Sequence, residues 1–88
     1  MQATKEMVQK IESCLHNGQT LKSIANFLKK EAVKEHGSSR LKFPEHGFNI
    51  MYTTNSNYGQ GLKNGYGAGL YAELKYTGFI QTVKLPMI

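Results

Sequence analysis

The chain changes character near Ser38–Arg40, and this change limits what it can fold into. Residues 1–37 carry lysines and apolar residues in the spacing of amphipathic helices. After the change the chain is rich in tyrosine, asparagine and glycine, and Lys63 is the only formally charged residue between His46 and Ala72. A basic helical half followed by a polar, aromatic half with strand-like alternation predicts an α+β protein. Such a composition is more typical of a binding module than of an enzyme.

Two amphipathic helices are predicted in the first half. Residues 3–16 place their apolar side chains on one face, and the Asn-Gly pair that follows can end a helix. Thr20 is a good N-cap for a second helix over Leu21–Lys34, which Gly37 ends. We therefore expect residues 1–37 to form an αα-hairpin. The apolar stripe expected on the second helix consists of Leu21, Ile24, Ala25, Leu28 and Ala32, with Phe27 at its margin.

The second half predicts an antiparallel β-meander of three to four strands within residues 40–88. Residues 48–54 and 79–85 alternate well enough for strands, and Ser38–Ser39 is expected to be a loop before the sheet. The helical hairpin would pack on one face of this meander, which makes residues 1–88 a single domain.

A glycine-rich hairpin is predicted at residues 58–69, which hold five glycines. Asn64-Gly65 is the strongest turn signal, because both central positions of a type I′ turn need a positive φ. It would join a strand near residues 58–63 to a longer one near residues 66–76. So many glycines also permit a mobile loop that orders when a partner binds, and the sequence leaves this alternative open.

Cysteine content and hydropathy narrow the class of protein. The single cysteine, Cys14, excludes an internal disulfide, and the mixed charges of residues 1–6 do not resemble a signal peptide. No apolar run approaches the roughly 20 residues that a membrane-spanning helix needs. The sequence therefore predicts a cytoplasmic protein without a membrane partner, whose oligomeric state stays open.

Catalytic and metal-binding patterns are weak. The chain has no aspartate, and one cysteine with three widely separated histidines fits no zinc spacing. No phosphate-binding loop is present, so no cofactor and no metal are expected. One enzymatic alternative is a metal-independent ribonuclease, which needs an acid, a base and a cation around one phosphate. Its candidate residues are Arg40, Lys42, His46 and Tyr52.

Charge and aromatic content favour nucleic-acid binding by a protein that is not an enzyme. The net charge is +5, of which +4 falls in residues 1–42. Lysines on the polar side of the second helix could follow phosphates, Asn26 could reach a base edge, and tyrosines could stack on unpaired bases. The predicted contact residues are Lys22, Asn26, Lys29, Lys30, Lys34, Arg40, Lys42, Tyr58, Lys63 and Tyr66, and further stacking candidates are Tyr71 and Tyr76.

The same β half supports a second hypothesis. The tyrosine, asparagine, serine and glycine of residues 52–71 are typical of adaptable protein-recognition surfaces. The alternative is an inhibitor or adaptor of phage or mobile-element type, for example anti-CRISPR-like, that binds a protein or ribonucleoprotein complex. An exposed sheet edge could also pair with a partner strand or a second copy. Because Arg40 is the one arginine, base-specific DNA recognition is less favoured than nucleic-acid binding that does not depend on base sequence.

Overall fold

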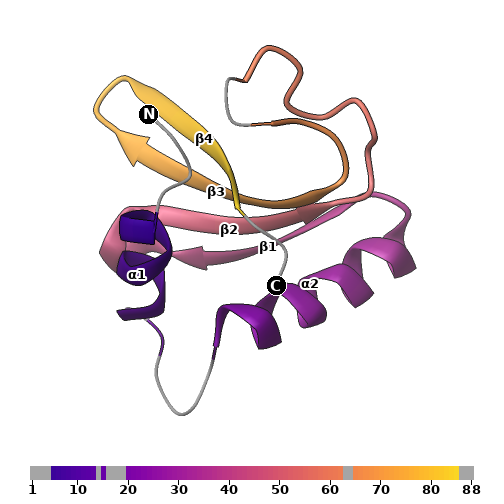
Figure 1. Ribbon diagram of the computed structural model, residues 1–88, viewed down its shortest axis with the longest axis horizontal. Helices are drawn as coiled ribbons and strands as arrows, with labels where there is room; N and C mark the ends of the chain where they lie inside the picture. Colours follow the sequence, from indigo (N-terminus) through magenta and orange to yellow (C-terminus); the bar gives the residue numbers. More distant parts are fainter. Residues whose placement is uncertain (1–4, 14, 16–19, 63–64, 86–88) are drawn as a thin grey trace.

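The computed structural model describes residues 5–13, 15, 20–62 and 65–85 (Figure 1). These residues form an α+β fold in which a sheet carries helices against one of its faces. The elements in chain order are α1 (Lys5–Ser13), α2 (Leu21–Glu35), β1 (Ser38–Phe43), the short 3₁₀ helix η1 (Pro44–His46), β2 (Phe48–Thr53), β3 (Gly69–Tyr76) and β4 (Phe79–Leu85).

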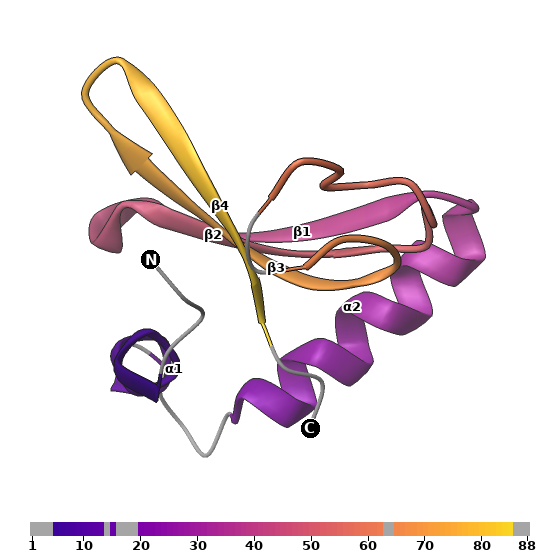
Figure 2. The same ribbon diagram turned by 45° about the horizontal axis from the view of Figure 1, so that its top comes forward.

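The sheet has four strands in the order β1-β2-β3-β4, and each pair of neighbours is antiparallel. The predicted antiparallel meander is therefore confirmed. Figure 2 shows the β3–β4 hairpin turned steeply away from the line of β1 and β2, as the twist of a sheet requires. As a consequence β1 and β4 are the two edge strands.

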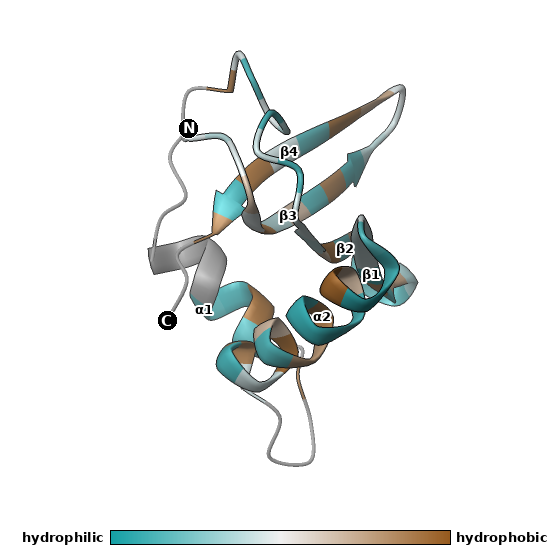
Figure 3. Cartoon of the chain, turned by 90° about the vertical axis from the view of Figure 1, so that its right-hand side faces the viewer, coloured by the Kyte–Doolittle hydropathy of each residue, from teal (hydrophilic) through white to brown (hydrophobic). Residues whose placement is uncertain are grey.

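The core lies between α2 and one face of the sheet. Every residue of the predicted apolar stripe of α2 is buried, which confirms that prediction. The sheet contributes alternate residues such as Ile50, Ala72 and Val83, and Leu41 and Phe43 pack against the same cluster from β1. Figure 3 shows the resulting pattern, with brown and teal segments succeeding each other along α2, β3 and β4.

Local signals fix both ends of α2. The hydroxyl of Thr20 accepts a hydrogen bond from the Ser23 backbone N–H, and the Ser23 hydroxyl accepts one from the Thr20 N–H. This reciprocal capping box confirms Thr20 as the N-cap. At the other end His36 adopts the left-handed conformation with φ 56°, so that its own N–H reaches the last carbonyls of the helix. The helix therefore ends at Glu35 with His36 as its left-handed C-cap, one residue before Gly37, which was predicted to end it.

The predicted αα-hairpin is not supported. The first helix is described over Lys5–Ser13, and residues 3, 4, 14 and 16 of the predicted range 3–16 lie outside the part of the chain that the structure describes, as do residues 17–19. Figure 2 looks nearly along α1 while α2 crosses the view, so the two helices are not antiparallel neighbours. The reason lies in packing, because Ile11 is buried in the common core with the sheet and Leu15 packs against that core.

One loop prediction and one strand prediction are also wrong. Ser38–Ser39 begins β1 and is no loop, because Ser38 pairs with Thr53 and the Gly37 carbonyl accepts a hydrogen bond from the Thr54 N–H at 3.0 Å. The strand predicted near residues 58–63 is absent over its described part, and β3 starts at Gly69.

Positive φ angles explain the missing strand. Within the predicted strand they occur at Gly59 and Gly61, and a chain with positive φ at two such close positions cannot follow an extended path. Gly65 and Gly67 after it also have positive φ. Asn64, the first of the two central residues of the predicted turn, lies outside the described residues. No described helix is long and apolar enough to cross a membrane.

Candidate nucleic-acid interface

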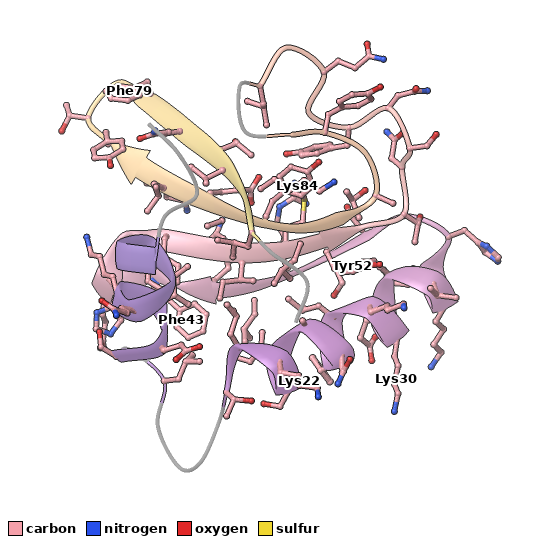
Figure 4. All side chains as sticks on the ribbon, in the orientation of Figure 1. Lys22, Lys30, Phe43, Tyr52, Phe79 and Lys84 are labelled. Carbon is pink, nitrogen blue, oxygen red and sulfur yellow. The ribbon has the colours of Figure 1, made fainter. Side chains whose placement is uncertain are left out.

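The exposed side of α2 carries the largest group of predicted contact residues. We name it the helix surface. Figure 4 shows Lys22 and Lys30 pointing away from the sheet, as expected for positions opposite a buried stripe. Within the described part of the chain none of its lysines forms an ion pair. The helix surface consists of Lys22, Asn26, Lys29, Lys30 and Lys34, all of them exposed.

Two carboxylates moderate the charge of α2. Glu31 is half-buried, and Glu35 is exposed at the last helical position. With four lysines against these two glutamates, α2 keeps a net charge of +2. Lys34 lies in the last turn, where a cation interacts favourably with the helix dipole. The helix surface is therefore a cationic strip on a rigidly held element.

The other predicted cations lie on the opposite side of the sheet. Side chains alternate along a strand, so Arg40 and Lys42 point away from α2 while their neighbours Leu41 and Phe43 pack against the core. The strand register places Lys75 and Lys84 on that same side. We name it the open sheet face. The structure therefore does not bring Arg40 and Lys42 together with the lysines of the helix surface. The charged residues of the open sheet face are Arg40, Lys42, Glu73, Lys75 and Lys84.

Arg40 already has a partner within the molecule. Its Nε donates to Glu73 Oε1 at 2.9 Å and its Nη2 donates to Glu73 Oε2 at 3.4 Å, so the interaction between guanidinium and carboxylate is bidentate. This hydrogen bonding raises the pKa of Arg40 further above its usual range. Lys42 is exposed, and the described residues offer it no ion pair. Of the two predicted β1 contacts, only Lys42 is thus unengaged.

The glycine-rich segment folds over the open sheet face. Tyr58 packs edge-on against Tyr71 with ring centroids 4.8 Å apart, and Tyr71 is fully buried. The Tyr71 hydroxyl donates to the Gly67 carbonyl at 2.7 Å, while Lys84 Nζ donates to the Tyr66 carbonyl at 2.7 Å. These contacts fasten the described parts of the segment, residues 54–62 and 65–68, to β3 and β4.

The predicted tyrosine contacts divide into internal and external ones. Tyr71 is buried with half-buried Tyr58 packed edge-on against it, whereas Tyr66 is 57% exposed. Tyr76 is exposed and stacks on Phe79 with ring centroids 4.9 Å apart. Lys63 lies outside the described residues. A base could therefore reach Tyr66 without any rearrangement of the structure.

The buried phenol of Tyr71 should make stability depend on alkaline pH. Burial raises the pKa of this phenol above its ordinary value of 10.0, and nearby Tyr58 adds a smaller increase. The unfolded chain ionises first, so the stabilising contribution is complete below about pH 10 and is lost as the pH rises towards the raised pKa. We expect the free energy of unfolding to fall more steeply above about pH 10 in the native protein than in Tyr71→Phe. Urea titrations of both proteins at several pH values above and below about pH 10 measure this difference. An equal dependence of the free energy of unfolding on pH in the two proteins would contradict the prediction.

The four ribonuclease candidates do not converge. The register places Tyr52 opposite Ser39, so its side chain lies on the α2 side and is buried, whereas Arg40 and Lys42 point to the other side. His46 sits in η1 with its ring 6.3 Å from that of Phe48. These side chains therefore do not surround one phosphate. Over the described residues no group of three potential metal ligands occurs either.

Sequence reasoning missed three surface features. Lys75 and Lys84 extend the cationic open face, and the alternation within residues 79–85 was a signal that could have placed Lys84 there. A groove of about 330 Å³ lies beside β1, lined by Ser23, Ile24, Phe27 and Leu41. The tip of the β3–β4 hairpin exposes Tyr76, Phe79 and Ile80.

Comparison with known proteins adds no relative. No family model matches the chain, and neither the curated proteins nor the solved structures contain a significant match to it.

Proposed function

We propose that this protein binds nucleic acid through the helix surface, by phosphate contacts that do not depend on base sequence. One observation carries the proposal. Four exposed lysines, without ion pairs to any described residue, line the outer side of a helix whose inner side is buried. Their charges are available to an anionic partner without the loss of internal contacts.

The length of α2 suits contact with the sugar-phosphate backbone of a nucleic acid. Fifteen residues of helix extend for about 22 Å, and the helix surface follows much of that length. Lysines held along such a line can neutralise successive phosphates and release their counterions. Asn26 lies within the same strip and can donate to a phosphate or reach a base edge. The buried stripe fixes the helix before binding, so little ordering is needed.

The open sheet face supports this role less well. The guanidinium of Arg40 is held by Glu73, and the ammonium of Lys84 donates to a backbone carbonyl. Lys42 and Lys75 remain as exposed cations there. We therefore assign the phosphate contacts to the helix surface and none to Arg40, Lys42, Tyr58 or Tyr66.

The test measures fluorescence anisotropy of labelled duplex DNA and single-stranded RNA at several salt concentrations. If the two central lysines each contact a phosphate, Lys29→Ala/Lys30→Ala should reduce the slope of log affinity against log salt on duplex DNA by about 1.8, at 0.9 per phosphate. The fold should persist, because both positions are exposed and alanine favours helix.

The matched control is Lys42→Ala/Lys75→Ala, which removes the same charge from the open sheet face. It should leave the salt slope within error of the native value. Equal effects of the two double variants would show a response to net charge alone and would overturn the assignment to α2. Absence of binding by the native protein at low salt would overturn the proposed function itself.

A further inference from the structure

We propose that the free edge of β1 binds an extended, acidic segment of a partner protein, which adds to the sheet as a fifth strand. The side chains of this segment that face α2 would be apolar and enter the groove beside Phe27. Those on the other side would be acidic and meet Lys42, next to the Arg40–Glu73 ion pair. This inference does not depend on the proposed function, because it uses another surface and another class of partner.

The backbone of β1 offers hydrogen-bonding groups to such a strand. The Gly37 carbonyl faces β2, since it accepts from the Thr54 N–H, and the backbone direction alternates along a strand. The N–H and C=O groups of Ser39 and Leu41 therefore also face β2. Those of Ser38, Arg40 and Lys42 face outward at the edge of the sheet, where no described strand pairs with them. An edge of this kind is a template for strand addition.

The side of this edge nearest α2 is apolar. The groove there is lined by the apolar side chains of Ile24, Leu41 and Phe27, the last of them 56% exposed, and by Ser23. A strand laid along β1 would direct every second side chain into this groove. Glu31 lies one helical turn after Phe27 and would repel a carboxylate on this side. The groove therefore selects apolar residues.

The other side of the edge is cationic. Arg40 and Lys42 both project there from β1, and Lys42 has no ion pair among the described residues. Glu73 is only 12% exposed and its ion pair with Arg40 is close to neutral, so Lys42 is the cation that remains for an acidic partner. A carboxylate of an added strand would lie beside Lys42. Opposite charges across neighbouring strands are stabilising.

Charge also argues against a second copy of this chain as the occupant. Two β1 strands paired around a twofold axis would bring Arg40 and Lys42 of one copy beside Arg40 and Lys42 of the other. Like charges on facing strands are destabilising, and lysines at an edge commonly prevent such self-pairing. An acidic strand converts the same repulsion into attraction. The predicted motif is thus an alternation of acidic and apolar residues over about six positions, the length of β1.

The probe for this proposal is a labelled synthetic eight-residue peptide in which glutamate alternates with valine. Two control peptides have the same composition, one with its glutamates and valines in separate blocks and one N-methylated at alternate backbone nitrogens. We expect the alternating peptide to bind at least tenfold more tightly than either control. In NMR spectra it should shift the amide signals of Ser38, Arg40 and Lys42 and slow their hydrogen exchange.

Charge reversal supplies the specific test. Lys42→Glu should weaken binding of the glutamate peptide about fivefold and should improve binding of a lysine-valine peptide, because the site then attracts cations. Phe27→Ala should weaken binding of both peptides, because it removes the apolar side chain that lines the groove. Lys29→Ala/Lys30→Ala should leave peptide binding unchanged, so loss of nucleic-acid binding and loss of peptide binding are separable.

Several outcomes would overturn the proposal. Equal binding of the three peptides, or no binding up to about 1 mM, would show that the edge does not select an alternating strand. Amide shifts confined to α2 would place any binding on the helix surface. A concentration-dependent dimer whose interface protects the β1 amides, seen without peptide, would make a second copy the occupant.

Discussion

Replacement of Tyr71 by alanine is expected to lower the free energy of unfolding by about 3–5 kcal/mol, as for other large buried aromatic residues. Tyr71 is fully buried, packs against Tyr58, and donates a hydrogen bond to Gly67. The alanine variant loses the aromatic packing and the hydroxyl, and the glycine-rich segment loses its attachment to β3. Because a protein of this size is stable by only about 5–15 kcal/mol, the variant should melt far below the native protein.

Tyr71→Phe is the control that separates packing from hydrogen bonding. It keeps the ring and removes only the hydroxyl, so we expect a loss of about 1 kcal/mol. Amide hydrogen exchange at Gly67 and its neighbours should accelerate in this variant. Urea denaturation of the two variants beside the native protein checks both values. A loss below about 1 kcal/mol for Tyr71→Ala would mean that the segment does not cover this face of the sheet.

Replacement of Leu28 by alanine is expected to cost about 2–5 kcal/mol. Leu28 has no exposed surface, lies in the middle of the buried stripe of α2, and belongs to the cluster that joins this helix to the sheet. Its truncation leaves a cavity at the contact that holds the helix surface in place. Thermal denaturation measures the effect.

Phe27→Ala is the matched control for Leu28→Ala. The two residues are neighbours on one helix, but Phe27 lies mostly in solvent, so its removal should change stability by less than about 0.5 kcal/mol. A comparable loss in both variants would contradict the orientation of α2. The same pair also tests the groove, because only Phe27→Ala should affect peptide binding without loss of fold.

Local signals made α2 predictable. A Thr at the N-cap, a regular apolar stripe and a stop near Gly37 all act within a few residues of each other, and they placed the helix to within about one residue. The strand β1 was missed for the opposite reason. Its serines have no strand preference of their own, and they are extended because Thr53 and Tyr52 lie across from them in β2.

The candidate site was predictable in composition and unpredictable in arrangement. Helical spacing placed the four lysines of α2 on one exposed side. It could not relate them to Arg40 and Lys42, because this relation depends on which face of the sheet α2 covers. Likewise nothing in the sequence distinguishes Tyr71 from an exposed tyrosine of the sheet. Its ring is buried because the glycine-rich segment, with Tyr58, folds over it.

The order of the strands bears on how quickly the chain can fold. Each strand pairs with its neighbour in sequence, so the β1–β2 and β3–β4 hairpins need only short loops. Joining the two hairpins requires closure of residues 54–68, and their glycines raise the conformational entropy that closure removes. The rate of folding should therefore be limited by the pairing of β2 with β3, which joins the two hairpins. Docking of Tyr71 under the glycine-rich segment should be among the last events.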